Sequence, residues 1–391
     1  MKKQKTEYTL YLKNKQLRKQ KAEKIKVAKF KRKKNKEKSK LHGLSSVIMK
    51  CHLDRAKFRR KFYSSRTYKD PKKVVCIEGD LGLESKKGID EFLNKSLEIV
   101  DFTNRELIFN LKKCTRMWPS ALTLLCSLKQ WVELSTRKRK FKPRLASTNS
   151  LCNEVNSYLH HSGFYDYVGR DADDCLEGYN NDEIVKIRRE KKTSNIEERE
   201  VEIIDILSRY TKYNKDEIRL FYATVLIESF LNVSEHGVSG YDNGWWVLAQ
   251  YHPTTGLISI NIADNGIGIK NSLITGPQRN VVLKQFPKNE FNDGQVIKYA
   301  TDIKVSGALK ASLKEKAGLF SSAKYPLGSN RGNGLDRIKS GCKQLGIEFT
   351  LLSHYGYLFY DALGNELKCG TMKNRIFAGT LYHFNVPALK G

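Results

Sequence analysis

Residues 257–269 constrain the fold most, because they join an apolar strand pattern to an acidic, glycine-rich turn. Apolar residues alternate over 257–262, which predicts a strand with one buried face. The strand leads into Asp264, followed by Gly266 and Gly268. A carboxylate at the end of a buried strand is costly without a partner, and glycines let a flat ligand approach the backbone closely. Taken alone, the pattern fits a ligand site or an ordinary turn equally well.

Length and composition predict a folded protein of two or three domains, with 391 residues of which 40% are hydrophobic. No run of about 18 apolar residues occurs, so no transmembrane segment is expected. The lysine-rich N-terminus lacks the apolar region of a secretory signal. The eight cysteines are scattered without metal-like spacing, which favours free thiols in a reducing compartment. These features together predict a cytoplasmic protein.

The positive charge is concentrated at the N-terminus. Residues 1–75 hold 28 Lys or Arg against 5 Asp or Glu, a net +23 of the chain's +29. Residues 1–71 are therefore predicted to form a basic, flexible or helical extension. Two interpretations stay open: an arm that binds nucleic acid or another polyanion, and a tail that only keeps the protein soluble.

Residues 72–170 carry the pattern of a small α/β domain. Strands are expected at 74–77, 107–111 and 142–146, and helices at 89–99, 120–134 and 151–159. This β-α-β-α-β-α order resembles a STAS-like domain. In that family the second strand leads to an Asp-Ser pair whose serine can be phosphorylated. Here Trp118-Pro119-Ser120 stands at that place, and we expect Ser120 to cap the following helix rather than to accept phosphate.

Residues 171–200 are charged and poor in apolar side chains, so they are predicted to form an exposed connection. After it, residues 216–237 predict a helix of about six turns that is apolar on most sides and therefore buried. Glu228, Asn232 and His236 follow each other at intervals of four and share one face of this helix. A buried helix with such a polar stripe suggests a polar ligand, although a narrow solvent-facing stripe would explain it too.

Three further patterns complete the C-terminal half. A strand at 245–251 and a four-residue turn precede the strand that ends at Asp264, which predicts a hairpin. Gly332 and Gly334 open a helix that runs to Leu345, and glycines at a helix N-terminus expose N–H groups that can hold phosphate. Gly379-Thr380 begins a last strand, which ends before Pro387.

In order and spacing, these motifs resemble the GHKL ATPase family of gyrases, Hsp90-type chaperones, sensor histidine kinases and MutL proteins. The resemblance covers about residues 201–387. It implies an α+β protein in which 201–391 form a Bergerat-type α/β sandwich, a mixed sheet with helices on one face. The STAS-like domain and the basic extension would precede it, and 270–331 would hold a lid that orders over ATP.

The resemblance also implies a role for each motif residue. Asn232 would coordinate Mg²⁺ that bridges the ATP phosphates, and Asp264 would accept the adenine amino group. Glu228 would act as general base. The remaining ATP-binding residues would be His236, Gly266, Gly268, Gly332, Gly334 and Thr380. For His236, a histidine that only stabilises the end of its helix is an equally good interpretation.

Three functions stay open. The first is a Mg²⁺-dependent ATPase that acts as a regulatory switch coupled to the STAS-like domain. The second is a serine/threonine kinase similar to anti-sigma-factor kinases, acting on a protein partner. The third is a nucleic-acid-associated adaptor that uses ATP structurally. A standard sensor kinase is not expected, because residues 184–215 contain no phosphoacceptor histidine. The resemblance also allows a homodimer.

Overall fold

The computed structural model describes residues 72–84, 92, 106–136, 144–147, 150–168, 181–191, 196–237, 244–275, 282, 286, 292–302, 334–372, 376–377 and 379–390. All of them belong to one compact unit, Lys57–Gly391. The predicted basic extension, Gly332 and most of the predicted lid and of the helix at 89–99 lie outside the described residues. No helix in the described ranges is both long enough and apolar enough to cross a membrane.

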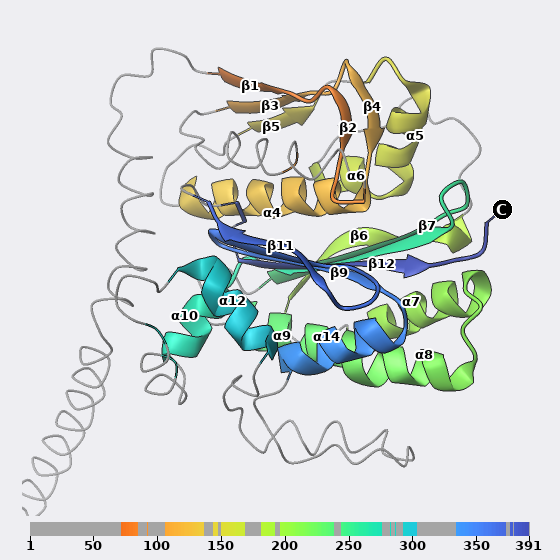
Figure 1. The fold of residues 1–391 in the computed structure, drawn as a ribbon. Helices are drawn as coiled ribbons and strands as arrows, with labels where there is room; N and C mark the ends of the chain where they lie inside the picture. The colour runs from red at the N-terminus through yellow and green to blue at the C-terminus, as the bar shows by residue number, and fades with distance from the viewer. Residues whose placement is uncertain are drawn as a thin grey trace, which may run out of the picture. The chain divides into compact units, whose positions relative to one another are not determined.

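A seven-stranded sheet forms the centre of the unit (Figure 1). Its strands in chain order are β6 (Ile184–Lys191), β7 (Gly244–His252), β8 (Leu257–Asp264), β9 (Glu348–Ser353), β10 (Gly356–Tyr360), β11 (Glu366–Thr371) and β12 (Thr380–Pro387). In space they run β11-β10-β9-β12-β8-β7-β6, and each neighbouring pair is antiparallel. The predicted hairpin is confirmed, since β7 pairs with β8 from His252 and Leu257 onward.

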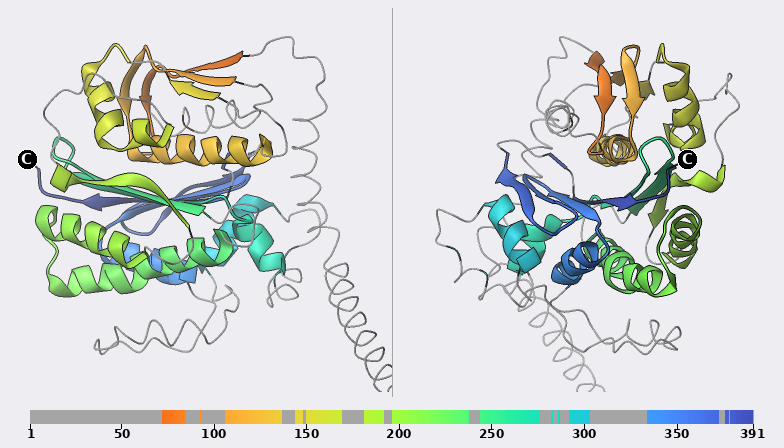
Figure 2. Two further views of the ribbon diagram at one scale, coloured as in Figure 1. Left: turned by 180° about the vertical axis from the view of Figure 1, so that it is seen from behind. Right: turned by 45° about the vertical axis from the view of Figure 1, so that its right-hand side comes forward.

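Helices cover one face of this sheet (Figure 2). They are α7 (Ile196–Tyr210), α8 (Lys215–Phe221), α9 (Ile227–Gly237), α10 (Gly268–Thr275), α12 (Asp293–Asp302) and α14 (Gly334–Gln344). A π-helical turn, η2 (Tyr222–Leu226), joins α8 to α9. Asn214 and Glu217 form a capping box at the start of α8, which explains why this helix begins one residue before the predicted 216.

The N-terminal unit, which means the described residues of 72–168 within Lys57–Gly391, covers the other face of the sheet. It contains a parallel sheet in the order β1-β3-β5 and a parallel pair β2-β4. Its strands are β1 (Lys72–Cys76), β2 (Gly79–Leu81), β3 (Glu106–Asn110), β4 (Cys114–Met117) and β5 (Arg144–Ser147). Its helices are α4 (Pro119–Thr136), α5 (Asn153–His161) and α6 (Phe164–Val168), and a short 3-10 turn, η1 (Asn181–Glu183), leads into β6. The predicted strands and the helices at 120–134 and 151–159 are confirmed within a few residues.

One apolar core joins the N-terminal unit to the large sheet. Leu122 and Leu125 of α4 belong to the same buried cluster as Trp246, Leu248 and Leu381 of the sheet. Side chains of a strand alternate between the two faces, so β7, β8 and β12 contribute to this core and to the core under the other helices. The predicted domains 72–170 and 201–391 therefore share buried apolar residues in the described part of the chain.

Two further predictions are wrong. The sheet of the C-terminal half is antiparallel rather than mixed, because short turns such as the one between β7 and β8 join neighbouring strands directly. The charged connection at 171–200 is also wrong for its second half, since 184–191 form β6 and α7 begins at Ile196. Ile184, Val185 and Ile187 are buried in β6, while the charged residues between them had indicated a solvated segment.

Candidate functional site

An open pocket lies on the helical side of the sheet, where β8 and β12 meet α9, α10 and α14. The cavity itself measures about 30 Å³, and the wider space of about 380 Å³ around it includes open solvent. Its lining combines a carboxylate, an amide and hydroxyl groups with apolar side chains, as in many small-molecule sites. The lining residues are Asn232, Asp264, Gly268, Ile269, Ser272, Leu273, Leu335, Thr380 and Tyr382.

Asp264 ends β8 at the base of this pocket and is only 1% exposed. Its Oδ1 accepts a hydrogen bond from the Gly266 N–H at 2.5 Å, which closes a tight turn after the strand. Thr380, the first residue of β12, lies directly opposite Asp264 in the antiparallel register. Two motifs more than 110 residues apart in the sequence are therefore adjacent.

Ser353 connects three elements around the pocket. Its hydroxyl accepts a hydrogen bond from the Ile269 N–H of α10 at 2.9 Å. The same hydroxyl lies 3.4 Å from the Thr380 hydroxyl, and Ser353 is also the register partner of Thr380. The ends of β9 and β12 and the first turn of α10 are thereby held together.

Two glycines near Asp264 are required by close packing. Gly268 has φ +73°, and a Cβ there would approach the ring of His354 within 2.8 Å. At Gly379 a Cβ would lie 2.2 Å from the carbonyl oxygen of Asp264. Any side chain at 379 would therefore push the start of β12 away from the turn that carries Asp264.

Asn232 brings its side-chain amide to the pocket wall. Its Nδ2 is buried and makes no hydrogen bond of good geometry with the described residues, although it faces the Tyr382 hydroxyl. Tyr382 lies beside it: burial raises the pKa of Tyr382 well above its usual range, and the Asn232 amide opposes this rise only in part. A buried polar atom without a partner is costly, so a polar ligand in the pocket would find a prepared contact.

Glu228 lies one turn before Asn232 on α9, and both face the start of α14. A Cβ built on Gly334 would lie 3.1 Å from Glu228 Oε2 and 3.7 Å from the Asn232 amide. Arg337, one turn into α14, forms an ion pair with the Glu228 carboxylate. Burial raises the pKa of Glu228, and Arg337 acts in the opposite direction.

The structure thus brings together most of the residues that the sequence singled out. Asp264, Gly266, Gly268 and Thr380 gather at the base of the pocket, and Glu228, Asn232 and Gly334 gather where α9 meets α14. The backbone of His236 belongs to α9, but its side chain and Gly332 fall outside the described residues. Four further residues of this region, Arg337, Ser353, His354 and Tyr382, were not predicted from the sequence. Arg337 alone had a signal, its position three residues after Gly334.

The turn that carries Asp264 is also bonded to the N-terminal unit. The Ser127 hydroxyl of α4 donates to Asn265 Oδ1 at 2.5 Å, and Asn265 Nδ2 donates back to the Ser127 carbonyl at 2.9 Å. Both side chains are at most 1% exposed. Asn265 stands between Asp264 and Gly266, so α4 directly supports the base of the pocket from the opposite face of the sheet.

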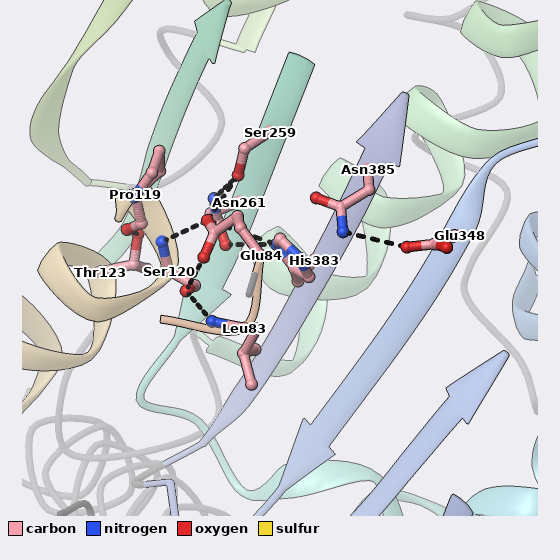
Figure 3. A network of polar contacts seen from close by, with 10 residues as sticks. All are labelled: Leu83, Glu84, Pro119, Ser120, Thr123, Ser259, Asn261, Glu348, His383 and Asn385. Carbon is pink, nitrogen blue, oxygen red and sulfur yellow. Dashed lines mark hydrogen bonds and ion pairs between the residues drawn. The ribbon is translucent and has the colours of Figure 1, made fainter. Parts of the chain in front are cut away.

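A second polar contact between α4 and the sheet centres on Glu84 (Figure 3). The Glu84 carboxylate is only 1% exposed. It accepts hydrogen bonds from the Ser120 N–H at 3.0 Å, the Ser120 hydroxyl at 2.5 Å and the Ser259 hydroxyl at 2.7 Å. His383 of β12 lies 3.9 Å away and also contacts Asn261 of β8 at 3.0 Å.

Ser120 therefore differs from its predicted role. It is the second residue of α4 rather than the residue before it, and its hydroxyl donates to Glu84 while accepting from the Leu83 N–H at 2.8 Å. Glu84, from a distant segment, satisfies the first turn of the helix. Ser120 is fully buried, so its hydroxyl is not accessible to a phosphate donor in this arrangement.

The charges in this network are set by burial and by neighbours. Burial alone would raise the pKa of Glu84, but His383 and the hydrogen bonds from Ser120 and Ser259 outweigh it, and the pKa is lowered. Burial lowers the pKa of His383, against the pull of Glu84. Burial likewise lowers the pKa of His252 to about 4. At neutral pH Glu84 is therefore ionised, and the nearby His252 imidazole is uncharged.

Comparison with known proteins adds no relative. No protein-family model, no curated protein and no solved structure matches this chain. In the described part of the chain, no group of three or more His, Cys, Asp or Glu side chains is placed to hold a metal ion. Any assignment of the pocket depends on its own geometry.

Proposed function

We propose that this chain is a Mg²⁺-dependent ATPase of the GHKL type that acts as a regulatory switch. The observation that carries the proposal is that Asp264, Thr380 and Asn232 line one pocket, while Glu228 and Gly334 lie next to Asn232 where α9 meets α14. The Asp264 carboxylate, at the base of the pocket, would bind the adenine amino group. The other end would receive the phosphates, next to the N-terminus of α14, whose N–H groups favour anions.

The donor set at the phosphate end is compatible with Mg²⁺. This ion prefers oxygen ligands and keeps several waters when phosphates share its coordination. The Asn232 side chain, which lines the pocket, offers one neutral oxygen of this kind. When bound, Mg²⁺ would neutralise charge on the phosphates.

The chemical step assigned to this chain belongs to Glu228. Its carboxylate would accept a proton from the water whose oxygen attacks the terminal phosphorus, while the bond to the ADP oxygen breaks. Burial raises the pKa of Glu228, which brings the carboxylate closer to the range suited to a general base at neutral pH.

The coupling to the N-terminal unit supports a switch rather than a free-standing ATPase. Ser127 of α4 is bonded to the residue after Asp264, and the Glu84 network fixes the start of α4 to β8. A displacement of α4 would therefore move the turn after β8, and with it Asp264, the residue proposed to bind adenine. The parallel β1-β3-β5 sheet, with α4 between β3 and β5 in the chain, is also in keeping with a STAS-like regulatory domain.

The proposed base is tested by Glu228→Gln. We expect phosphate release to fall by at least about 100-fold, because general bases contribute about 10²–10⁴ to rates, while ATP binding is retained. Phosphate release and ATP titration by calorimetry on the full chain measure the two effects. Glu197→Gln, at an exposed site on α7, serves as control. Equal turnover in both variants would contradict the assignment, and label transferred from γ-phosphate to protein would favour the kinase.

The proposed coupling is tested by Ser127→Ala, which removes the donor to Asn265. We expect ATP affinity to fall by about threefold to tenfold, the equivalent of one hydrogen bond of about 1 kcal/mol. Thr123→Val is the matched control, since the Thr123 hydroxyl is buried one turn earlier on α4 but donates to its own helix at Pro119. An equal change in ATP affinity for both variants would show that α4 acts only through general stability.

A further inference from the structure

The ion pair between Glu228 and Arg337 joins α9 to α14 next to Asn232, where the proposed function puts the phosphates. Its partners come from α9 and from the first turn of α14, and their side chains are 15% and 36% exposed. Gly334, one turn before Arg337, packs against both Glu228 and Asn232. The guanidinium therefore lies where the proposed function requires both a free carboxylate and room for phosphate oxygens.

A carboxylate held by a guanidinium is a poor proton acceptor. Arg337 opposes the rise in pKa that burial gives Glu228, and the hydrogen bond between them takes up an oxygen, Oε1, that a water molecule would need. The structure thus combines a carboxylate suited to base catalysis with a neighbour that suppresses it.

We propose that the Glu228–Arg337 ion pair is an autoinhibitory lock, and that Arg337 moves from Glu228 to the terminal phosphate when a nucleoside triphosphate binds. The inference rests on the proposed function, because it needs phosphates next to α14. It adds Arg337 as a residue that senses the third phosphate and releases the base in the same movement.

Competition between anions explains why the lock opens only for a triphosphate. A terminal phosphate carries more charge than a carboxylate and, like a carboxylate, can accept two N–H groups of a guanidinium at once. The N-terminal dipole of α14 favours an anion at the same place. The Arg337 side chain is more than one third exposed, so it can change partners without leaving a buried cavity. A diphosphate would lack the group that attracts it.

The lock predicts a specific pattern of nucleotide affinities. In Glu228→Gln the guanidinium is no longer held, so ATP should bind at least about fivefold tighter relative to ADP than in the wild type, as expected for one charge-assisted contact. In the double variant Glu228→Gln/Arg337→Ala this gain should disappear. Calorimetric titration of the full chain with ATP and with ADP, both with Mg²⁺, measures the ratio in all four proteins of the cycle.

The double variant also guards against misfolding, because it leaves no unpaired carboxylate at 228. Lys343→Ala removes a positive charge from the exposed last turn of α14 and should leave the ATP/ADP ratio unchanged. An unchanged ratio in Glu228→Gln, or a gain that survives Arg337→Ala, would overturn the lock alone. If none of the four proteins binds ATP, the proposed function fails and the lock with it.

Discussion

Asp264→Asn is expected to abolish most of the rise in melting temperature that ATP confers on this protein. The asparagine keeps an oxygen for the Gly266 N–H, so the turn after β8 can persist. It replaces an acceptor-only carboxylate with a group that also donates, and the adenine amino group then loses a charge-assisted hydrogen bond of about 1.5–3 kcal/mol. This corresponds to a loss in affinity of about 10-fold to more than 100-fold.

Thermal unfolding with and without ATP measures this effect, since a ligand that binds only the folded state raises its stability. Guanine presents a carbonyl oxygen where adenine has its amino group, so the wild type should prefer ATP over GTP and the variant should lose that preference. Asp216→Asn, at an exposed ion pair on α8, is the control. If Asp264→Asn retained both ATP stabilisation and the preference over GTP, the pocket would not be an adenine site.

Much of the pocket could be predicted because its motifs end regular elements. The alternation before Asp264 and the run after Thr380 indicated strands, and strand ends on one side of a sheet converge. The four-residue spacing of Glu228 and Asn232 indicated a shared helix face, which the structure confirms at Gly334. These inferences need only local periodicity and the position of each motif within its element.

Contacts between remote segments could not be predicted in this way. Glu84 and Ser259 are 175 residues apart, and nothing near Glu84 distinguishes it from a surface acid. Arg337 likewise had no marked partner, because the packing of α14 on α9 selects Glu228. The charged strand β6 was missed for another reason: it is an edge strand that leaves charged side chains such as Arg188 in solvent, and a register shift after Val185 interrupts the alternation of its buried residues.

Removal of the Glu84 carboxylate should have the largest effect on stability. We expect Glu84→Ala to lower the free energy of unfolding by about 3 kcal/mol or more, because it leaves the Ser120 N–H and the Ser120 and Ser259 hydroxyls buried without their acceptor. Urea unfolding measures the change, provided that the unfolding free energy falls with urea concentration at the same slope in both proteins. ATP affinity should fall as well. Without Glu84 the start of α4 is no longer fixed to β8, and the Ser127–Asn265 contact would transmit any shift of α4 to the turn that carries Asp264.

The pH dependence of this effect distinguishes an ionised Glu84 from a neutral one. Because its pKa is lowered in the folded state, the stability it contributes is fully present above the unfolded-state value of 4.5 and is lost as the pH falls through the folded-state pKa. The difference between wild type and Glu84→Ala should therefore be constant above pH 4.5 and shrink below it. Glu78→Ala is the matched control, because Glu78 is 56% exposed in a surface pair with Lys113 and should change stability by less than about 1 kcal/mol. Similar losses of unfolding free energy in both variants would mean that the Glu84 hydrogen bonds do not hold α4 to the sheet. The polar coupling between the N-terminal unit and the pocket would then depend on the Ser127–Asn265 contact.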